Sequence, residues 1–382
     1  MKKIVTIGEL GIIITGNTPP RSNPKLYGNY TPFIKATDIS ETEKYTYHPE
    51  EYYSEEGYNK YIKSLIPKGS TCVVTIGSIG KKMTIAHCDL FINQAMNAII
   101  PNENFDNEYV YYAVKNILPN IKMLDSGTAS GRENVSKSAF SKMQILIEDN
   151  IITQRRIAEI LFRYDSLIEN YQKQIKLLEE STQRLYKEWF VDLRFPGHEN
   201  TKIVDGIPEG WEKMCLGDLV CFKRGKTITK KEIIEGNIPV VAGGIEPAYY
   251  CNKSNTGNRV ITISASGANA GYTRMYFEKI WASDCSFIDC SMTNYFHFVY
   301  CYLIANKIAI DNLQKGAAQP HVYPKDINAL ALCCPHNDIL DSFESKISYY
   351  FDLISSLQKQ IHKLTEARDR LLPKLMGGEI EV

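Results

Sequence analysis

The sequence of 382 residues has no excess of charge of either sign and no long apolar run. Its 44 lysine and arginine residues balance 44 aspartate and glutamate residues, which excludes a strongly basic protein that binds nucleic acid without regard to sequence. No apolar run reaches the ~18 residues that a membrane-spanning helix needs, and no signal-peptide pattern follows Met1. We therefore expect a cytoplasmic protein with no membrane partner.

Patterns that hold metals or phosphates are also lacking. The ten cysteines include no Cys-x-x-Cys pair and the seven histidines no His-x-x-x-His pair, which argues against a zinc site and a disulfide framework. The glycine-rich run at residues 77–82 lacks the first glycine and the final serine or threonine of a phosphate-binding loop. The sequence thus predicts no catalytic residue, no metal ligand and no cofactor in this chain.

What the chain does contain is a repeat of itself. Gly8-Glu9-Leu10 recurs as Gly217-Asp218-Leu219, an offset of 209 residues (217 minus 8). Gln172–Ile175 recurs identically as Gln358–Ile361, an offset of 186 (358 minus 172), because the second copy has a shorter middle. Each copy has a region of short predicted strands and loops followed by one long helical pattern. A period near 200 residues is far above solenoid repeats of ~20–50, so the sequence predicts two similar domains.

Two segments have the apolar spacing of long helices. In residues 151–190, and again in residues 343–375, apolar side chains recur at intervals of four and three, as in a coiled coil. The first series is interrupted only by Thr182 and the second by Arg368. We expect the two apolar seams to pair as an antiparallel coiled coil; the alternative is that each helix packs on its own domain. Pro373 is expected to end or kink the second helix near its C-terminus.

These patterns predict an α+β protein with two globular mixed domains in pseudo-twofold tandem repeat, separated by the two long helices. The segment before the second copy is rich in proline and glycine, as linkers are. The expected boundaries are 1–150 for the first domain, 151–190 for the first helix, 191–210 for a linker, 211–336 for the second domain, and 337–382 for the second helix and the C-terminal tail.

Equivalent loops in both copies carry side chains suited to DNA. Arginine, lysine, asparagine and glutamine can contact base edges, whereas lysine, serine and threonine more often hold phosphates. The candidates in the first copy are Thr18, Arg21, Lys25, Lys35, Thr37, Lys81, Lys82, Arg132 and Asn134; those in the second are Lys223, Arg224, Lys226, Thr227, Asn269, Arg274, Gln319 and His321.

An ordered set of short motifs runs through the chain. The loop Gly16-Asn17-Thr18-Pro19 is followed by Gln154–Leu161 (Gln-Arg-Arg-Ile-Ala-Glu-Ile-Leu), and the first helix ends in Leu185–Asp192. The chain closes with Leu371–Ile380 (Leu-Leu-Pro-Lys-Leu-Met-Gly-Gly-Glu-Ile). Over essentially its whole length the chain resembles the specificity subunit of type I restriction-modification systems. The second copy departs from the pattern because residues 225–228 lack the proline.

The resemblance implies two target-recognition domains, each of which binds one half of a split double-stranded DNA sequence. It also implies that the paired helices act as a spacer and as the docking surface for two methyltransferase subunits, which restriction subunits then join. S-adenosylmethionine, ATP and magnesium would belong to those partners.

Two other kinds of function are compatible with parts of this pattern. A stand-alone DNA methyltransferase with its own recognition domains would need a cofactor-binding motif, and the sequence has no recognisable one. A coiled-coil adaptor without a role on DNA would not need basic and polar loops in both copies.

Overall fold

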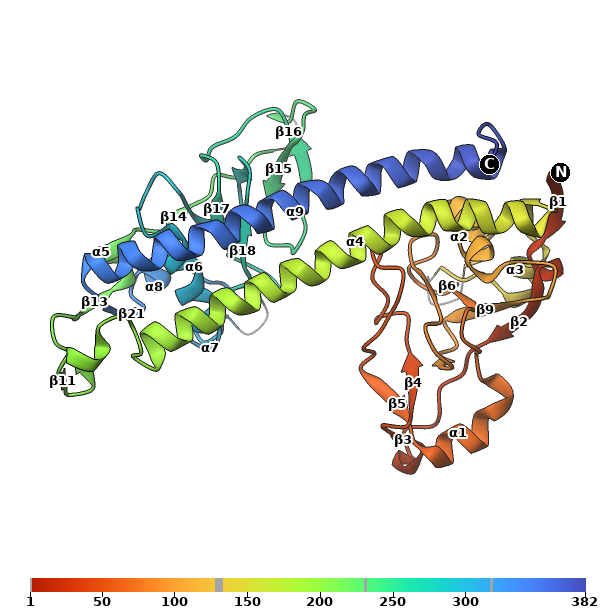
Figure 1. Ribbon diagram of the computed structural model, residues 1–382, viewed down its shortest axis with the longest axis horizontal. Coiled ribbons are helices and arrows are strands. Elements are labelled where there is room, and N and C mark those ends of the chain that lie inside the picture. The colour runs from red at the N-terminus through yellow and green to blue at the C-terminus, as the bar shows by residue number, and fades with distance from the viewer. Residues whose placement is uncertain (1, 128–132, 230–231, 317–318) are drawn as a thin grey trace. The chain divides into compact units, whose positions relative to one another are not determined.

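The computed structural model describes residues 2–127, 133–229, 232–316 and 319–382 (Figure 1). Arg132, one of the candidate DNA contacts, lies outside these residues. The chain divides into two compact units. Unit 1 comprises residues 1–172 and 360–382, and unit 2 comprises residues 173–359. Each unit contains one domain of strands and short helices and a segment of each long helix.

Unit 1 is built on short, mostly antiparallel sheets. Strand β1 (Lys2–Thr6) pairs with β10 (Gln144–Glu148). A four-stranded sheet has the order β2 (Gly11–Thr15), β9 (Met96–Pro101), β6 (Thr71–Val74) and β7 (Met83–Ile85). A second sheet has the order β3 (Tyr27–Gly28), β5 (Glu51–Tyr53), β4 (Thr31–Ile34) and β8 (Phe91–Ile92). All four residues of β6 are buried, which explains its continuous Thr-Cys-Val-Val run.

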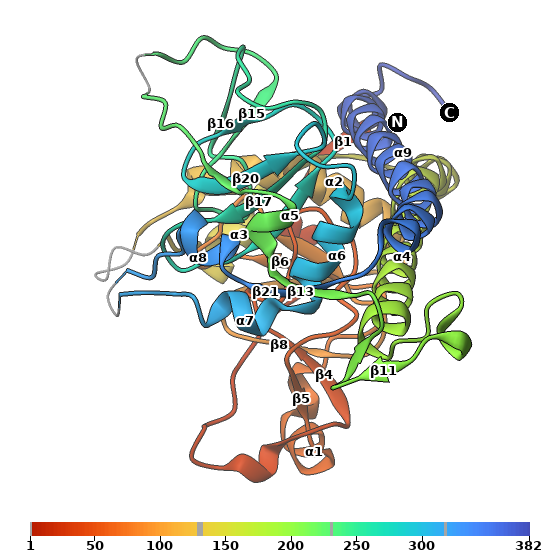
Figure 2. The ribbon, with the colours of Figure 1, turned by 90° about the vertical axis from the view of Figure 1, so that its left-hand side faces the viewer.

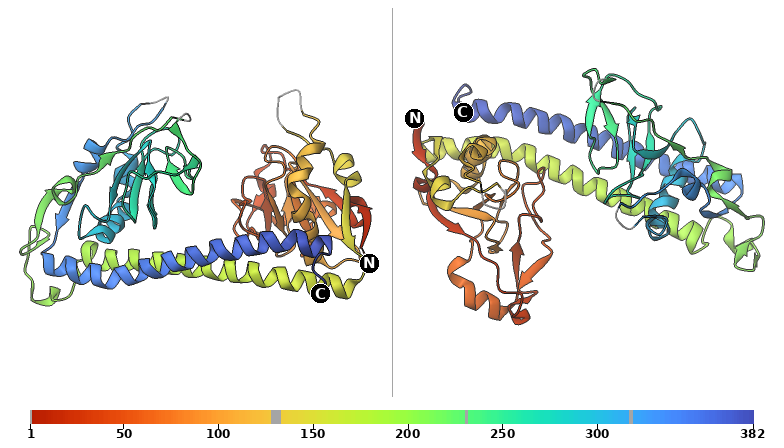
Figure 3. Two further views of the ribbon diagram at one scale, coloured as in Figure 1. Left: turned by 90° about the horizontal axis from the view of Figure 1, so that it is seen from above. Right: turned by 180° about the vertical axis from the view of Figure 1, so that it is seen from behind.

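Three α-helices complete the domain of unit 1: α1 (Glu55–Tyr61), α2 (Asn107–Ile117) and α3 (Lys137–Lys142). Side-chain caps determine where they begin. Asp106 accepts a hydrogen bond from the Tyr109 amide at 3.0 Å, and Ser136 accepts one from the Ala139 amide at 3.1 Å. Helix α2 lies between the β2–β9–β6–β7 sheet and the long helices, because its buried tyrosines and valines share one core cluster with both (Figure 3).

Unit 2 repeats this plan. Strand β13 (Glu212–Cys215) pairs with β21 (Ala331–Cys334). A four-stranded sheet has the order β14 (Lys223–Arg224), β20 (Cys285–Asp289), β17 (Val260–Ser264) and β18 (Thr273–Tyr276). A third has the order β16 (Tyr249–Cys251), β15 (Ile238–Val241) and β19 (Trp281–Ala282). Pairing is parallel between β15 and β19, as it is between β4 and β8. The shared sheet order confirms the internal repeat.

The short helices of unit 2 are α5 (Leu216–Leu219), α6 (Phe296–Ala305), α7 (Lys307–Asp311) and α8 (Pro324–Asn328). Helix α6 corresponds to α2 of unit 1. Figure 2 shows it between the strands β17 and β20 and the long helices. Phe298 of α6 shares a core cluster with Ile261 of β17 and with Phe343 of the second long helix.

The two long helices are α4 (Ile151–Tyr186), which continues as a π-helical turn over Lys187–Val191, and α9 (Asn337–Gly377). Helix α9 runs through Pro373 and ends close behind it, at Gly377, in line with the expectation that the helix ends near this proline. In unit 1, Leu161 of α4 shares a core cluster with Leu372 of α9. In unit 2, Trp189 shares one with Phe343. Within each unit the helical segments therefore pack on each other as well as on the domain.

The segment expected to be a linker has structure of its own. Strands β11 (Ile203–Val204) and β12 (Ile207–Pro208) form a small hairpin. Its turn is Asp205-Gly206, and both residues have positive φ (53° and 77°), as a tight Asp-Gly hairpin turn requires. Phe195 and Trp211 on either side are buried against each other, with ring centroids 5.0 Å apart. The ends of this segment thus belong to the core of unit 2.

Candidate nucleic-acid interface

In unit 1 several of the predicted loops meet around residues 92–95, a turn between β8 and β9. The Asn17 amide donates to the Ile92 carbonyl at 3.0 Å, and the Thr18 hydroxyl hydrogen-bonds the exposed side chain of Gln94. The Thr75 amide, at the end of β6, donates to the Ala95 carbonyl at 2.8 Å. Backbone contacts therefore hold the loop that carries Thr18 against this turn.

The glycine-rich turn at 77–82 joins the same loops. Gly77 has a φ of 88°, which favours glycine, and its amide donates to the Glu133 carbonyl at 3.0 Å. The isolated bridge between Ile76 and Asn134 brings Asn134 to this turn. Lys81 is exposed, and the Lys82 ammonium lies 3.5 Å from the Ala36 carbonyl, next to Thr37. We call these loops, at residues 17–18, 35–37, 75–82, 92–95 and 133–135, loop cluster 1.

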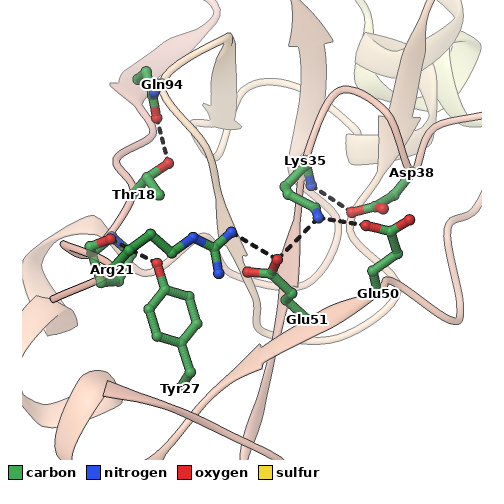
Figure 4. A network of polar contacts seen from close by, with 9 residues as sticks. Thr18, Arg21, Tyr27, Lys35, Asp38, Glu50, Glu51 and Gln94 are labelled. Carbon is green, nitrogen blue, oxygen red and sulfur yellow. Dashed lines mark hydrogen bonds and ion pairs between the residues drawn. The ribbon is translucent and has the colours of Figure 1, made fainter. Parts of the chain in front are cut away.

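Arg21 and Lys35 form ion pairs with two neighbouring glutamates, Glu50 and Glu51 (Figure 4). The Arg21 guanidinium contacts the Glu51 carboxylate at 2.8 Å, and the Lys35 ammonium contacts Glu50 at 2.6 Å and Glu51 at 3.1 Å. The hydrogen bond from Arg21 is the main reason that the pKa of Glu51 is below its ordinary value, so Glu51 stays ionised. Arg21 also lies 4.7 Å from the centre of the Tyr27 ring. Both cations therefore have partners that DNA phosphates would have to compete with.

Unit 2 has an equivalent cluster around residues 281–285. The Lys226 amide donates to the Ala282 carbonyl at 2.9 Å, as Asn17 does to Ile92 in unit 1. The Gly267 amide donates to the Pro320 carbonyl at 3.1 Å, and an isolated bridge joins Ser266 to His321. We call these loops, at residues 224–227, 265–271, 281–285 and 319–322, loop cluster 2.

The side chains in loop cluster 2 differ from those in loop cluster 1. Asp284 takes the place of Gln94, and it pairs with the Arg224 guanidinium and accepts a hydrogen bond from the Ser266 hydroxyl. The half-buried Asn269 lies in the turn, and the His321 ring stacks on the Tyr323 ring with centroids 6.0 Å apart. The two clusters thus share a backbone arrangement and present different groups.

The remaining candidates fall into two classes. Arg274 stands apart from loop cluster 2, because it donates to the Ile245 carbonyl at 2.7 Å and lines a cavity of about 260 Å³ with Phe351 and Gln358 of α9. The others are exposed on loops, a strand end or, for Lys25, a 3-10 turn, where they are accessible to a ligand: Lys25, Lys223, Thr227 and Gln319.

Three lysines that the sequence did not single out surround a groove of about 430 Å³ in unit 1. Lys60 lies in the last turn of α1, Lys63 lies in the 3-10 turn that follows, and Lys137 begins α3. All three are exposed, and none forms an ion pair with the residues that the structure describes. Comparing the two copies could not reveal Lys60 and Lys63, because the first copy is longer here: the offset falls from 209 at Gly8 to 190 at Gly77 (267 minus 77).

The described residues also bear on two other kinds of site. Among them no group of three or more His, Cys, Asp or Glu side chains could hold a metal ion. No helix in the same part of the chain is long and apolar enough to cross a membrane.

Comparison with known families decides between the alternatives. The model of the type I restriction modification DNA specificity domain matches residues 2–180 and again residues 208–367. The chain belongs to this family. Its role is that of a type I DNA sequence-specificity subunit, as its motifs predicted, and the two matched spans coincide with the two copies found in the sequence.

Relatives of the specificity subunit support this assignment over the full length. The chain is 30% identical to the type I restriction enzyme MjaIX specificity subunit of Methanocaldococcus jannaschii, over 100% of this chain and 93% of the relative. It is 27% identical to a putative type I specificity subunit of Mycoplasma genitalium, over 82% of each chain. The crystal structure of a type I S subunit from M. genitalium matches the fold with a TM-score of 0.61 at 19% identity, covering 98% of this chain and 96% of that one.

Proposed function

We propose that the specificity subunit binds a bipartite, asymmetric double-stranded DNA target, with loop cluster 1 on one half-site and loop cluster 2 on the other. The observation that carries this proposal is that the two clusters have the same backbone contacts and different side chains. Because their backbone arrangements are similar, the two clusters would dock on DNA in the same way. Their unlike side chains, such as Gln94 and Asp284, would select different bases. The target-recognition domains are residues 1–150 and 211–336 in this proposal.

Helices α4 and α9 would form an antiparallel coiled coil that separates the two domains and offers a docking surface for two methyltransferase subunits. Restriction subunits would join through these. The packing of α4 on α9 inside each unit supports this arrangement. The chain itself would be non-catalytic, with S-adenosylmethionine, ATP and magnesium bound by the partners, and the cytoplasmic location expected from the sequence stays a prediction.

The groove lined by Lys60, Lys63 and Lys137 would hold DNA phosphates next to the first half-site. Exposed ammonium groups without an ion pair among the described residues suit this task, because each phosphate contact releases counterions from the DNA. In contrast, Arg21 and Lys35 would first have to leave Glu50 and Glu51. The proposal thus assigns affinity mainly to the lysine groove and sequence discrimination mainly to the loop clusters.

Single substitutions in each cluster test this function. In the complex with its methyltransferase, Lys81→Ala should change recognition only at the half-site of loop cluster 1, and Arg224→Ala only at the other. A lost base contact costs about 1–3 kcal/mol and relaxes one position, whereas a lost phosphate contact weakens binding to all sequences equally. Exposed Lys202, which lies in neither cluster, provides the control. A substitution in one cluster that relaxes the distant half-site would contradict independent recognition.

A further inference from the structure

A buried ion pair joins α4 to α9 in unit 1. Asp165 of α4 is 7% exposed and Arg368 of α9 is 6% exposed. The Arg368 guanidinium donates to one Asp165 carboxylate oxygen at 2.6 Å, and the Tyr112 hydroxyl of α2 donates to the other at 2.6 Å. Lys115 of α2 adds a positive charge nearby, and Asp369 contacts the outer side of Arg368 at 2.8 Å. The ion pair is therefore buried, and its charged groups have hydrogen-bond partners, where α4 and α9 meet in unit 1.

The internal repeat shows that the matching positions of unit 2 hold no equivalent ion pair. The offset of 186 that relates Gln172–Ile175 to Gln358–Ile361 places Thr182 at the position of Arg368 and Phe351 at the position of Asp165. Thr182 and Phe351 lie in unit 2, and each is 1% exposed. The apolar seams are otherwise alike, since Ile157, Leu161 and Ile168 correspond to Phe343, Ile347 and Ile354 at the same offset.

Similar seams create a choice of partner, because α4 could pair with α9 or with α4 of a second copy. In an α4–α4 pair of the same register, each Asp165 would face Thr182 instead of an arginine. In an α9–α9 pair, each Arg368 would face Phe351. Removing one partner from a buried ion pair is strongly unfavourable, because the remaining charge stays out of water without compensation. Tyr112 and Lys115 belong to the same half of the chain as Asp165, so they would stay beside it in an α4–α4 pair. They would reduce the cost of burying the Asp165 charge, but they would not supply the missing ion pair with arginine.

We propose that the Asp165–Arg368 pair determines which helices pair, so that the N-terminal half of the chain accepts the C-terminal half and rejects a second copy of itself. The nearest parallel is a buried polar residue that specifies the partner in a coiled coil. A molecule with two unlike recognition domains needs this choice, because self-paired halves would carry two identical domains. The proposal rests on contacts inside unit 1 and on the repeat, and it holds whatever DNA the loop clusters bind.

The test starts from the intact, folded chain. A specific protease site is inserted at the exposed turn Asp205-Gly206, and the folded protein is cleaved there into an N half and a C half. Isotope-labelled and unlabelled cleaved proteins are then mixed in dilute urea until N–C complexes of mixed label show that the halves have exchanged. Native mass spectrometry counts the N–C, N–N and C–C complexes. For the unchanged sequence we expect N–N complexes at less than about 1% of N–C complexes, since each unpaired charge costs on the order of 10-fold or more.

Three variants identify the cause. Thr182→Arg gives the N half an arginine for Asp165 of a second N half, and it should raise the N–N fraction at least about 10-fold. Thr182→Met has a similar side-chain length without the charge and should leave the fraction unchanged. In the double variant Thr182→Arg with Phe351→Asp, each of the N–C, N–N and C–C complexes has two ion pairs, so their proportions should approach those of random pairing. This variant also controls for poor folding of Thr182→Arg alone, because Asp at position 351 gives the introduced arginine an acidic partner in unit 2. A statistical distribution for the unchanged sequence, or equal effects of arginine and methionine, would overturn the proposal.

Discussion

Replacing Arg368 by methionine measures how much the buried pair stabilises unit 1. The change removes one side of a 2.6 Å contact between two side chains that are both less than one-tenth exposed. Breaking such a pair typically costs about 3–5 kcal/mol of unfolding free energy. Lys115 remains beside Asp165 in the variant and is still charged at neutral pH, because burial lowers its pKa only to about 8. We therefore expect a loss at the lower end, about 3 kcal/mol.

The same variant has a defined pH dependence. In the native chain, burial would raise the pKa of Asp165, but Lys115 and Arg368 outweigh it and hold the pKa below its ordinary value. Its contribution is thus present above the unfolded pKa of about 3.9 and is lost as pH falls through the native pKa. Without Arg368 the pKa of Asp165 should rise above the unfolded value, so that protonation favours the folded variant. The deficit should therefore shrink as the pH is lowered from neutral toward the unfolded pKa of about 3.9.

Urea unfolding followed by circular dichroism measures both the loss of unfolding free energy and its dependence on pH. Arg370→Met is the matched control, because Arg370 is exposed and its ion-pair partner among the described residues is Glu366 on the same helix; it should cost less than about 0.5 kcal/mol. Asp165→Asn combined with Arg368→Met should be less destabilised than Arg368→Met alone, since the uncompensated charge is gone. A cost below about 1 kcal/mol for Arg368→Met, or no rescue in the double variant, would refute the reasoning.

Three further predictions follow from the same contacts. Replacing Lys60, Lys63 and Lys137 together by alanine should weaken DNA binding at every sequence and reduce the slope of log affinity against log salt by up to about 3, measured by fluorescence anisotropy; an unchanged slope would exclude the groove. Glu51→Gln should remove the ion pair of Arg21, leave Lys35 paired with Glu50, and tighten binding to unrelated DNA in the same assay, whereas weaker binding would show that Glu51 positions Arg21 for contact. Residues 1–200, expressed with the methyltransferase partner, should methylate an interrupted palindrome weakly, and Thr182→Arg should strengthen this methylation; an asymmetric methylated site would contradict pairing of the fragment through α4.

The repeat and the helices could be predicted because they depend on periodic patterns. The offset between Gly8 and Gly217 and the four-and-three spacing of the seams are visible without any structure. The structure adds that α9 runs through Pro373. The missing amide hydrogen bond of a proline can be tolerated in the last turns of a helix whose other residues, such as Leu372 and Leu375, are anchored in the core.

The candidate site was less predictable, because it depends on contacts between distant residues. Loop positions followed from the repeat, and the structure brings most of them together around residues 92–95 and 281–285. No local signal showed that Glu51 would pair with Arg21, 30 residues away, or that Arg274 would lie against α9. The lysine groove could not be predicted because Lys137 and Lys63 are far apart in the sequence and because α1 has no counterpart among the described residues of the second copy.

The bipartite, asymmetric target is the central claim, and the methylated sequence of genomic DNA tests it most directly. Cells without other methyltransferases would express the chain with its methyltransferase partner, and long-read sequencing would map the modified bases. We predict one motif with two unlike half-sites and a non-specific spacer of constant length, because two different loop clusters bind at a separation that the helices set. A palindromic motif, or a continuous motif without a spacer, would contradict the assignment of the two clusters to two different half-sites.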